Sequence, residues 1–235
     1  MSIADLPDCL TRPQIEEAIV KPVAYALAPS PVPLLHVRRV LSRRHGMHAA
    51  RSFCHGWGIQ QLWQFHDPAT GFELVLFGWQ GRSYLVAIGS NDATDWKRNL
   101  TQLDVGLAAY RANQAAVKEA IGRASSNAEI IVAGHSLGGA VAQYIAIDHP
   151  GVTHCLTYQT AAVPPEFVAK SFDRDMSDLQ TAHHLHISDP VYPLSKRRCD
   201  GGLILGPVAM HGDRVHGFDR VKAHSLMLSL LPTTG

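Results

Sequence analysis

A serine between two closely spaced glycines is the residue of this 235-residue sequence best suited to chemistry. Ser136 lies in the segment Glu129–Ala140, which reads EIIVAGHSLGGA and contains the pattern Gly-x-Ser-x-Gly. A strand-like run precedes it and a helix-like run follows it. Such a strand-to-helix turn lifts the hydroxyl out of a sheet and points helix N-terminal N–H groups at it, where they favour negative charge. The pattern predicts that Ser136 is a nucleophile rather than an idle serine in a glycine-rich turn.

A serine nucleophile needs a base that accepts its proton and an acid that orients this base. In folds built around such a turn, the acid and then the base follow the serine in the chain. Asp189 is the favoured acid because it follows the alternating strand His184–Ile187, and sheet sites gather at carboxyl ends of strands. A carboxylate that caps the turn before Pro190 is the alternative interpretation. The other acids after Ser136 are Asp148, Glu166, Asp173, Asp175, Asp178, Asp200, Asp213 and Asp219.

Three histidines after Asp189 are candidate bases. His211 and His216 lie in a polar segment with glycines, which we interpret as a loop. His224 instead stands beside an apolar stretch, where a terminal helix is expected and a ring can be held firmly. We therefore favour His224 as the base and keep His211 as the alternative.

The sequence predicts neither a metal site nor a bound cofactor. His184 and His186 share one face of their strand, a spacing that can ligate a metal, but no nearby cysteine or second histidine pair completes a site. The cysteines are scattered without a Cys-x-x-Cys spacing, so we expect plain and mostly buried thiols. They are Cys9, Cys54, Cys155 and Cys199.

The net charge of +1, from 21 Lys and Arg against 20 Asp and Glu, argues against a nucleic-acid partner. The balance hides a segregation, because residues 18–66 carry no acid and six basic residues, which leaves −5 for the remainder. A solvated surface is one interpretation of this segment, and a patch for anionic lipid headgroups is the other. The basic residues are Lys21, Arg38, Arg39, Arg43, Arg44 and Arg51.

The order of apolar patterns predicts one α/β domain over residues 1–235, and 46% hydrophobic residues suffice for a sizeable core. Strands are expected at 60–65, 72–79, 84–88, 129–133, 153–158 and 183–187. Helices are expected at 11–28, 105–124, 137–148 and around 221–231. The first three strands suggest an antiparallel meander, and the later alternation predicts a mostly parallel sheet with helices on both faces.

The sequence shows neither a Sec-type leader nor a membrane-spanning segment. Acids appear early, at Asp5 and Asp8, and no apolar leader core follows Met1. The long uncharged stretch Ile130–Ile147 is interrupted by glycines and polar residues, which suits a turn between two elements. We expect a cytoplasmic location by default and keep export by a route without a Sec signal as an alternative.

The sequence resembles the class 3 lipases, the fungal-type triacylglycerol lipase group of α/β-hydrolases. Gly134–Ala140 looks like the nucleophile elbow of that family. Upstream, Val86–Ser90 and Asp95–Leu100 resemble its FRGT/S strand end and its DWxxNL motif. Downstream, Ser188–Leu194 and Ala223–Leu226 are similar to its nDpVPrLP and aHlxY motifs. The motifs occur in the order that the family has.

This resemblance implies an α/β-hydrolase fold and serine-dependent hydrolysis of lipid or lipid-like carboxylic esters, without a cofactor. Carried over residue by residue, it implies Ser136 as the nucleophile, Asp189 as the acid and His224 as the base. It also implies an oxyanion hole formed at Ser90 and Leu137.

Two departures from the family pattern bear on the substrate. Ile88 stands where the family usually has an arginine, and Asn91–Thr94 is short and polar where these lipases commonly carry an apolar lid helix. A soluble or lamellar ester is therefore a better expected substrate than bulk triacylglycerol. The alternative enzyme is a phospholipase A that acts on anionic membranes, as an exported toxin would. The alternative of another class is a hydrolase-fold binding protein with an idle site. The sequence does not predict the oligomeric state.

Overall fold

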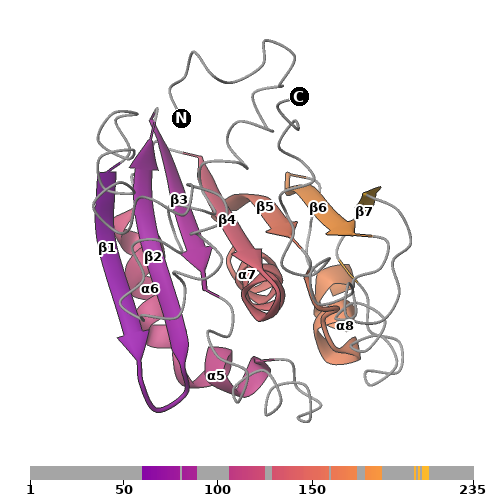
Figure 1. Ribbon diagram of the computed structural model, residues 1–235, viewed down its shortest axis with the longest axis horizontal. Coiled ribbons are helices and arrows are strands. Elements are labelled where there is room, and N and C mark those ends of the chain that lie inside the picture. The colour runs from indigo at the N-terminus through magenta and orange to yellow at the C-terminus, as the bar shows by residue number, and fades with distance from the viewer. Residues whose placement is uncertain are drawn as a thin grey trace, which may run out of the picture.

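The computed structural model describes residues 60–79, 81–88, 106–124, 129–158, 160–173, 178–186, 204, 206 and 208–211. The helical segments expected at 11–28 and around 221–231 lie outside these residues. The elements, which Figure 1 labels, are β1 (Gln60–Asp67), β2 (Phe72–Trp79), β3 (Arg82–Ala87), α5 (Leu107–Ala112), α6 (Gln114–Arg123), β4 (Ile130–His135), α7 (Leu137–Asp148), β5 (Val152–Tyr158), α8 (Pro165–Asp173), β6 (Gln180–His186) and β7 (Val208–His211).

The strands of the described residues form one seven-stranded sheet whose order follows the chain from β1 to β7. β2 is antiparallel to both β1 and β3, whereas every neighbouring pair from β3 to β7 is parallel. In Figure 1 the arrowheads of β3 and β4 accordingly point one way and that of β2 the other. The predicted mostly parallel sheet with an antiparallel N-terminal meander is confirmed.

The helices α5 to α8 bury their apolar sides against one face of the sheet. Each connection from β3 to β6 steps to the next strand in the same direction, and right-handed crossovers then place the connecting helices on a single face. Leu76, Leu85, Val132 and Cys155 form a row across this face, because they lie directly opposite one another on adjacent strands. The prediction of packed helices is confirmed for this face, and helices expected on the other face fall outside the described residues.

The other face of the central strands is also apolar and buried. Its buried side chains include Val75, Phe77, Tyr84, Val86 and Ile131. A strand that is buried on both faces has a nearly continuous apolar sequence instead of an alternation, as in the run Ile130–Ala133 of β4. The sheet is therefore the central layer of the fold, and the carboxyl ends of its parallel strands share one edge.

The single helix expected at 105–124 is corrected to two helices, α5 and α6, which meet at Asn113. The buried Asn113 side chain donates from Nδ2 to Ala109 O at 2.9 Å, to Asp67 Oδ2 at 3.1 Å and to Thr70 Oγ1 at 3.1 Å. A side chain that bonds to nearby backbone competes with continuation of the helix. The same amide fastens the helix pair to the turn between β1 and β2.

The short strand β7 is not among the expected strands, and its residues Met210 and His211 correct the start of the loop expected there. It pairs in parallel with β6, from His183 opposite Val208 to His186 opposite His211. Four residues are too few to show an alternation of apolar and polar side chains. The segment forms a strand because it can pair with the edge of β6, and not because of its own strand propensity. The consequence for the site is that the backbone of His211 lies at the end of a strand.

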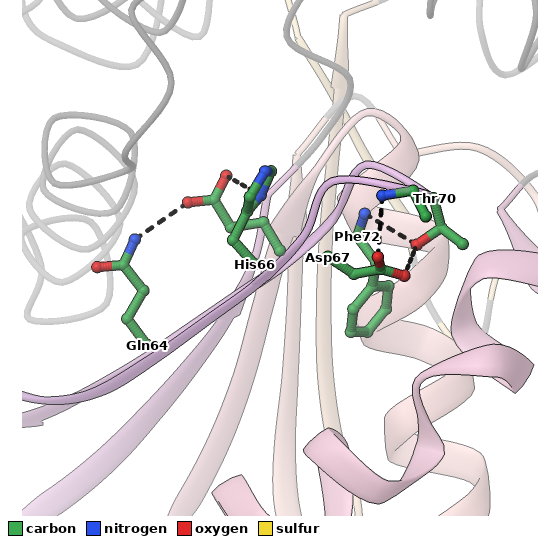
Figure 2. A network of polar contacts seen from close by, with 7 residues as sticks. Gln64, His66, Asp67, Thr70 and Phe72 are labelled. Carbon is green, nitrogen blue, oxygen red and sulfur yellow. Dashed lines mark hydrogen bonds and ion pairs between the residues drawn. The ribbon is translucent and has the colours of Figure 1, made fainter.

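A buried carboxylate, Glu73, faces two side chains of β1. Gln64 Nε2 donates to Glu73 Oε1 at 3.3 Å, and His66 Nδ1 lies 3.8 Å from Glu73 Oε2. Figure 2 shows both β1 side chains turned toward this carboxylate. Burial raises the pKa of Glu73, while His66 and Gln64 act to lower it. The carbonyl of Glu73 also accepts the backbone N–H of Ile88.

We expect Glu73 to make the protein less stable as the pH rises. Its pKa is higher in the folded than in the unfolded chain, so the folded state holds its proton more tightly. This stabilisation is complete below the usual glutamate pKa of about 4.3 and is lost as the pH rises through the raised value. Glu73→Gln should flatten this part of the profile of unfolding free energy against pH, measured with urea. Equal slopes for the two proteins would contradict the assignment.

Candidate active site

Ser136 stands at a sharp turn between β4, which ends at His135, and α7, which begins at Leu137. Its backbone angles are φ 57° and ψ −123°, and among the described residues it is the single non-glycine residue with a positive φ. Such a conformation costs on the order of 1–3 kcal/mol and persists only where the surroundings enforce it. The predicted strand, turn and helix are all present at this serine.

Two glycines allow the strand and the helix to meet at this turn. A Cβ atom on Gly134 would overlap the carbonyl of Gly138 and would lie 2.7 Å from the backbone nitrogen of Gly139. A Cβ atom on Gly139 would lie 2.5 Å from Thr160 Oγ1 and 2.6 Å from Thr160 Cβ. Any side chain at either position would force α7 away from the sheet, so the glycines are a steric requirement of the turn.

The carbonyl of Ser136 is held from two sides. It accepts the N–H of Gly139 at 3.0 Å, from the first turn of α7, and the N–H of Ala161 at 3.4 Å, from the segment that follows β5. The side chain of Ser136 makes no capping hydrogen bond to α7. The backbone contacts therefore fix the peptide that follows Ser136, and with it the direction in which the hydroxyl leaves the turn.

The first turn of α7 is suited to hold negative charge beside Ser136. Leu137 is the first residue of this helix, and the first N–H groups of a helix have no acceptor within it. They also form the positive end of the helix dipole, and α7 has no acidic residue in its first turn. Preorganised N–H groups of this kind stabilise the oxyanion of an acyl-transfer reaction.

Three predicted site residues, Ser90, Asp189 and His224, lie outside the described residues. The strands that lead to two of them are described. β3 ends at Ala87, which is level with Gly134 of β4, and β6 ends at His186. Ser90 and Asp189 each come three residues after these strand ends in the sequence. Both strands are parallel to β4 and end at the edge of the sheet that carries Ser136.

Two of the alternative acids are engaged elsewhere. Asp148 is the last residue of α7, about 18 Å along the helix from its start, and accepts hydrogen bonds from Tyr110 Oη at 2.9 Å and Lys170 Nζ at 3.1 Å. Burial and the nearby Asp148 carboxylate raise the pKa of Tyr110. Glu166 pairs with Arg111 at 2.9 Å. These contacts join α5, α7 and α8 and leave neither acid beside the turn.

Two buried polar residues beside the turn were not foreseen from the sequence. Gln143, on α7, and Thr160, after β5, are both 0% exposed. Gln143 stands inside the apolar run Ala140–Ile147, and a polar residue at such a place is a signal that could have found it. Thr160 carries no comparable signal, because polar residues are common where a strand ends.

Within the described residues, no group of three or more His, Cys, Asp and Glu side chains could hold a metal ion. Cys155 is a buried free thiol whose pKa is raised by that burial, as expected for a plain core cysteine. Cys9, Cys54 and Cys199 lie outside the described residues. The helices of the described part are too short or too polar to cross a membrane.

Residues 58–187 match the family model of the Tle-like phospholipase domain. The match covers more than half of the chain and includes every element from β1 to β6, with the turn at Ser136 among them. The chain belongs to this family. This match confirms the predicted relationship to lipid ester hydrolases. The name of the family refers to phospholipases and not to triacylglycerol lipases.

This Tle-like phospholipase domain is 32% identical over 92 residues to the extracellular phospholipase A1 of Serratia liquefaciens, a match that covers 39% of the chain and 28% of the Serratia protein. The chain thus spans less than a third of that relative. Its fold is similar to lipase II of Rhizopus niveus, with a TM-score of 0.52, 18% identity and coverage of 81% and 78% of the two chains.

A second solved structure is a triacylglycerol lipase described as having a serine protease triad at its catalytic centre. The similarity has a TM-score of 0.52 and 16% identity, with coverage of 77% of this chain and 74% of the other. Sequence identities this low show a similar fold and nothing more. Together with the strand order they confirm the predicted α/β-hydrolase fold of this Tle-like phospholipase domain.

Replacing Gly139 by alanine should damage the turn. The new Cβ would meet the backbone and side chain of Thr160, and overpacking of this kind costs about 1–3 kcal/mol. Gly122→Ala on α6 is the matched control, because a Cβ there meets nothing within 4 Å and should stabilise the helix by up to about 1 kcal/mol. Urea unfolding of both variants checks the difference. A loss of stability in Gly122→Ala equal to that in Gly139→Ala would refute the steric argument.

Proposed function

We propose that this domain is a phospholipase of the A type, which hydrolyses acyl ester bonds of glycerophospholipids. The observation that carries the proposal is the place of Ser136 within the stretch that matches a phospholipase family, on a strained turn at the positive end of α7. The name of the Serratia relative, a phospholipase A1, supports cleavage of an acyl ester. The fungal neighbour from Rhizopus niveus supports the fold on which this chemistry is proposed.

In the proposed reaction Ser136 attacks the ester carbonyl while His224 takes the proton from its hydroxyl. The tetrahedral intermediate collapses, the ester C–O bond breaks, and His224 gives the proton to the leaving lysophospholipid alcohol. Water then loses a proton to His224 and attacks the acyl-enzyme. The bond between the acyl carbon and the serine oxygen breaks, His224 returns the proton to that oxygen, and the fatty acid leaves. Asp189 keeps the His224 ring in the required tautomer.

The oxyanion of each tetrahedral intermediate is proposed to bind between the backbone N–H groups of Leu137 and Ser90. The first of these groups belongs to the helix start described above, and the second follows the end of β3. Removal of one such donor typically costs about 100- to 1000-fold in turnover. The place of Leu137 at the start of α7 supports this proposal.

The strand spacing supports His224 over His211 as the base. His211 ends β7, which is three strands away from β4, and neighbouring strands lie about 4.8 Å apart. The backbone of His211 is therefore about 14 Å to the side of β4, too far for a direct hydrogen bond to Ser136. β6 lies two strands from β4, so an acid that follows it leaves room for an imidazole between acid and nucleophile.

The basic segment 18–66 supports a membrane of anionic lipid as the place of reaction. It carries six basic residues and no acid, while the remainder of the chain sums to −5. Each basic side chain near an anionic surface contributes about 1 kcal/mol to binding. The Serratia relative is named as extracellular, which favours export of this domain over the default cytoplasmic location.

Ser136→Ala should abolish release of fatty acid and leave the fold intact, because the replacement removes only the attacking oxygen. The measurement is mass spectrometry of the acids released from a mixture of phospholipids, glycerides and short-chain esters. Ser171→Ala is the matched control, since that hydroxyl lies on α8 and donates to Val168 O. Undiminished hydrolysis by Ser136→Ala would falsify the assignment.

The same mixture distinguishes the alternatives. Preferred release from phospholipids supports the proposal, and preferred release from glycerides would identify a lipase instead. A fluorophosphonate probe, which reacts with activated serines, should label the wild type and not Ser136→Ala. An unlabelled wild type would point to a binding protein with an idle site. Asp189→Asn should lower turnover by about 10,000-fold if this residue is the acid.

Binding to vesicles that contain phosphatidylglycerol should weaken as salt is added, because charges at an exposed surface are screened. Replacing Arg43 and Arg44 together by glutamine should weaken binding about 30-fold at low salt, from about 1 kcal/mol for each residue. Arg123→Gln on α6 is the control, because it removes a basic residue outside the segment. Binding that does not depend on salt, or equal effects of the two changes, would argue against the role of the segment.

A further inference from the structure

The side chain of Gln143 connects two segments that meet behind Ser136. Gln143 lies on α7, one turn after Gly139, and is 0% exposed. Its Nε2 atom donates to Thr160 Oγ1 at 2.9 Å, to Ala161 O at 3.2 Å and to Gly139 O at 3.3 Å. The first turn of α7 and the segment after β5 are thus joined by one carboxamide.

Packing alone does not account for a glutamine at this position. Its neighbours on the helix, Val141, Ala142, Tyr144 and Ile145, are all buried with it. A buried polar side chain costs free energy unless it is hydrogen-bonded, and an apolar residue would suit the interior of this helix better. The glutamine is explained by the three buried oxygen atoms to which its amide nitrogen donates.

Thr160 fills the space that the glycine of the turn leaves open. Its Oγ1 and Cβ lie where a Cβ of Gly139 would be, and its hydroxyl donates to Ala161 O at 3.0 Å. The same hydroxyl accepts the hydrogen bond from Gln143. The segment after β5 is therefore pressed against the first turn of α7 and held there by the amide.

The two residues that hold the Ser136 carbonyl are the same two whose carbonyls bind Gln143. Gly139 and Ala161 donate their N–H groups to Ser136 O, at 3.0 and 3.4 Å. Their own carbonyl oxygens accept from Gln143 Nε2. The amide thus sets the distance between the two donors that enforce the unfavourable backbone conformation of Ser136.

We infer that Gln143 is a positioning residue for the Ser136 nucleophile, and this rests on the proposed function of Ser136. Gln143 does not touch the reacting atoms. It acts through Gly139 and Ala161, which keep the hydroxyl of Ser136 aligned with the carbonyl it attacks. A misplacement of about 1 Å at a reacting group can cost about 100-fold in rate. Loss of the amide should consequently reduce reactivity more than it reduces stability.

The experiment compares Gln143→Met with Asn113→Leu in the full chain. Asn113 is a matched control, since it is also a buried carboxamide that donates from one nitrogen to three oxygens, and it lies between α5 and α6, against the turn between β1 and β2. For each variant we measure urea unfolding, the rate of fluorophosphonate labelling of Ser136, and kcat and KM on phospholipid vesicles. All rates are taken where both variants are fully folded.

Both variants should lose stability, but only Gln143→Met should slow labelling and kcat, by about 10- to 100-fold with little change in KM. Thr160→Val, which removes the hydroxyl and keeps the shape, should slow labelling in the same direction. Normal labelling of Gln143→Met and Thr160→Val, or equal slowing by Asn113→Leu, would overturn the inference. A wild type that does not react with the probe would instead overturn the proposed function and, with it, any role in positioning.

Discussion

At one turn, the backbone of β4 and the first turn of α7 are in direct contact at Gly134 and Gly138, and Ser136 is held between them with a positive φ. This contact determines much of what surrounds it. The strand must be central, because Gly134 pairs with Ala87 on one side and Thr157 on the other. The helix must lie close to the sheet, which only glycines at positions 134 and 139 allow. The segment after β5 must then return to Ser136 to support its carbonyl.

The energies involved are of similar size. The strained backbone at Ser136 costs about 1–3 kcal/mol, and one well-placed oxyanion donor supplies about 3–4 kcal/mol to a transition state. Stabilisation of the transition state can therefore offset the backbone strain only if the donors and the hydroxyl are held in fixed positions. Hydrogen bonds from Gly139 and Ala161 meet that condition through the main chain, where motion is smallest. A mobile turn would keep the strained backbone without stabilising the transition state.

Local sequence patterns predicted the elements that carry their own signals. The bounds of α7 and β2 agree with the expectation, because glycines and turn residues delimit long apolar runs. The strand-to-helix turn at Ser136 was predicted for the same reason. The break at Asn113 depends on a contact with the turn at Asp67, 46 residues away, which periodicity does not contain. β7 depends on the neighbouring strand. Asp189 and His224 lie outside the described residues, so the acid and the base stay predictions from their positions in the sequence and from the family resemblance.

The agreement between strand order and chain order has a consequence for how the molecule is made. Each strand pairs with one that was synthesised just before it, so the sheet can grow by addition at one edge as the chain leaves the ribosome. The hairpin connections between β1, β2 and β3 are short, so the entropy of closing them is small, whereas each connection from β3 to β6 contains at least one helix. Asp189 and His224, the proposed acid and base, follow β6 in the chain. The turn at Ser136 is therefore synthesised before the two residues that are proposed to activate it.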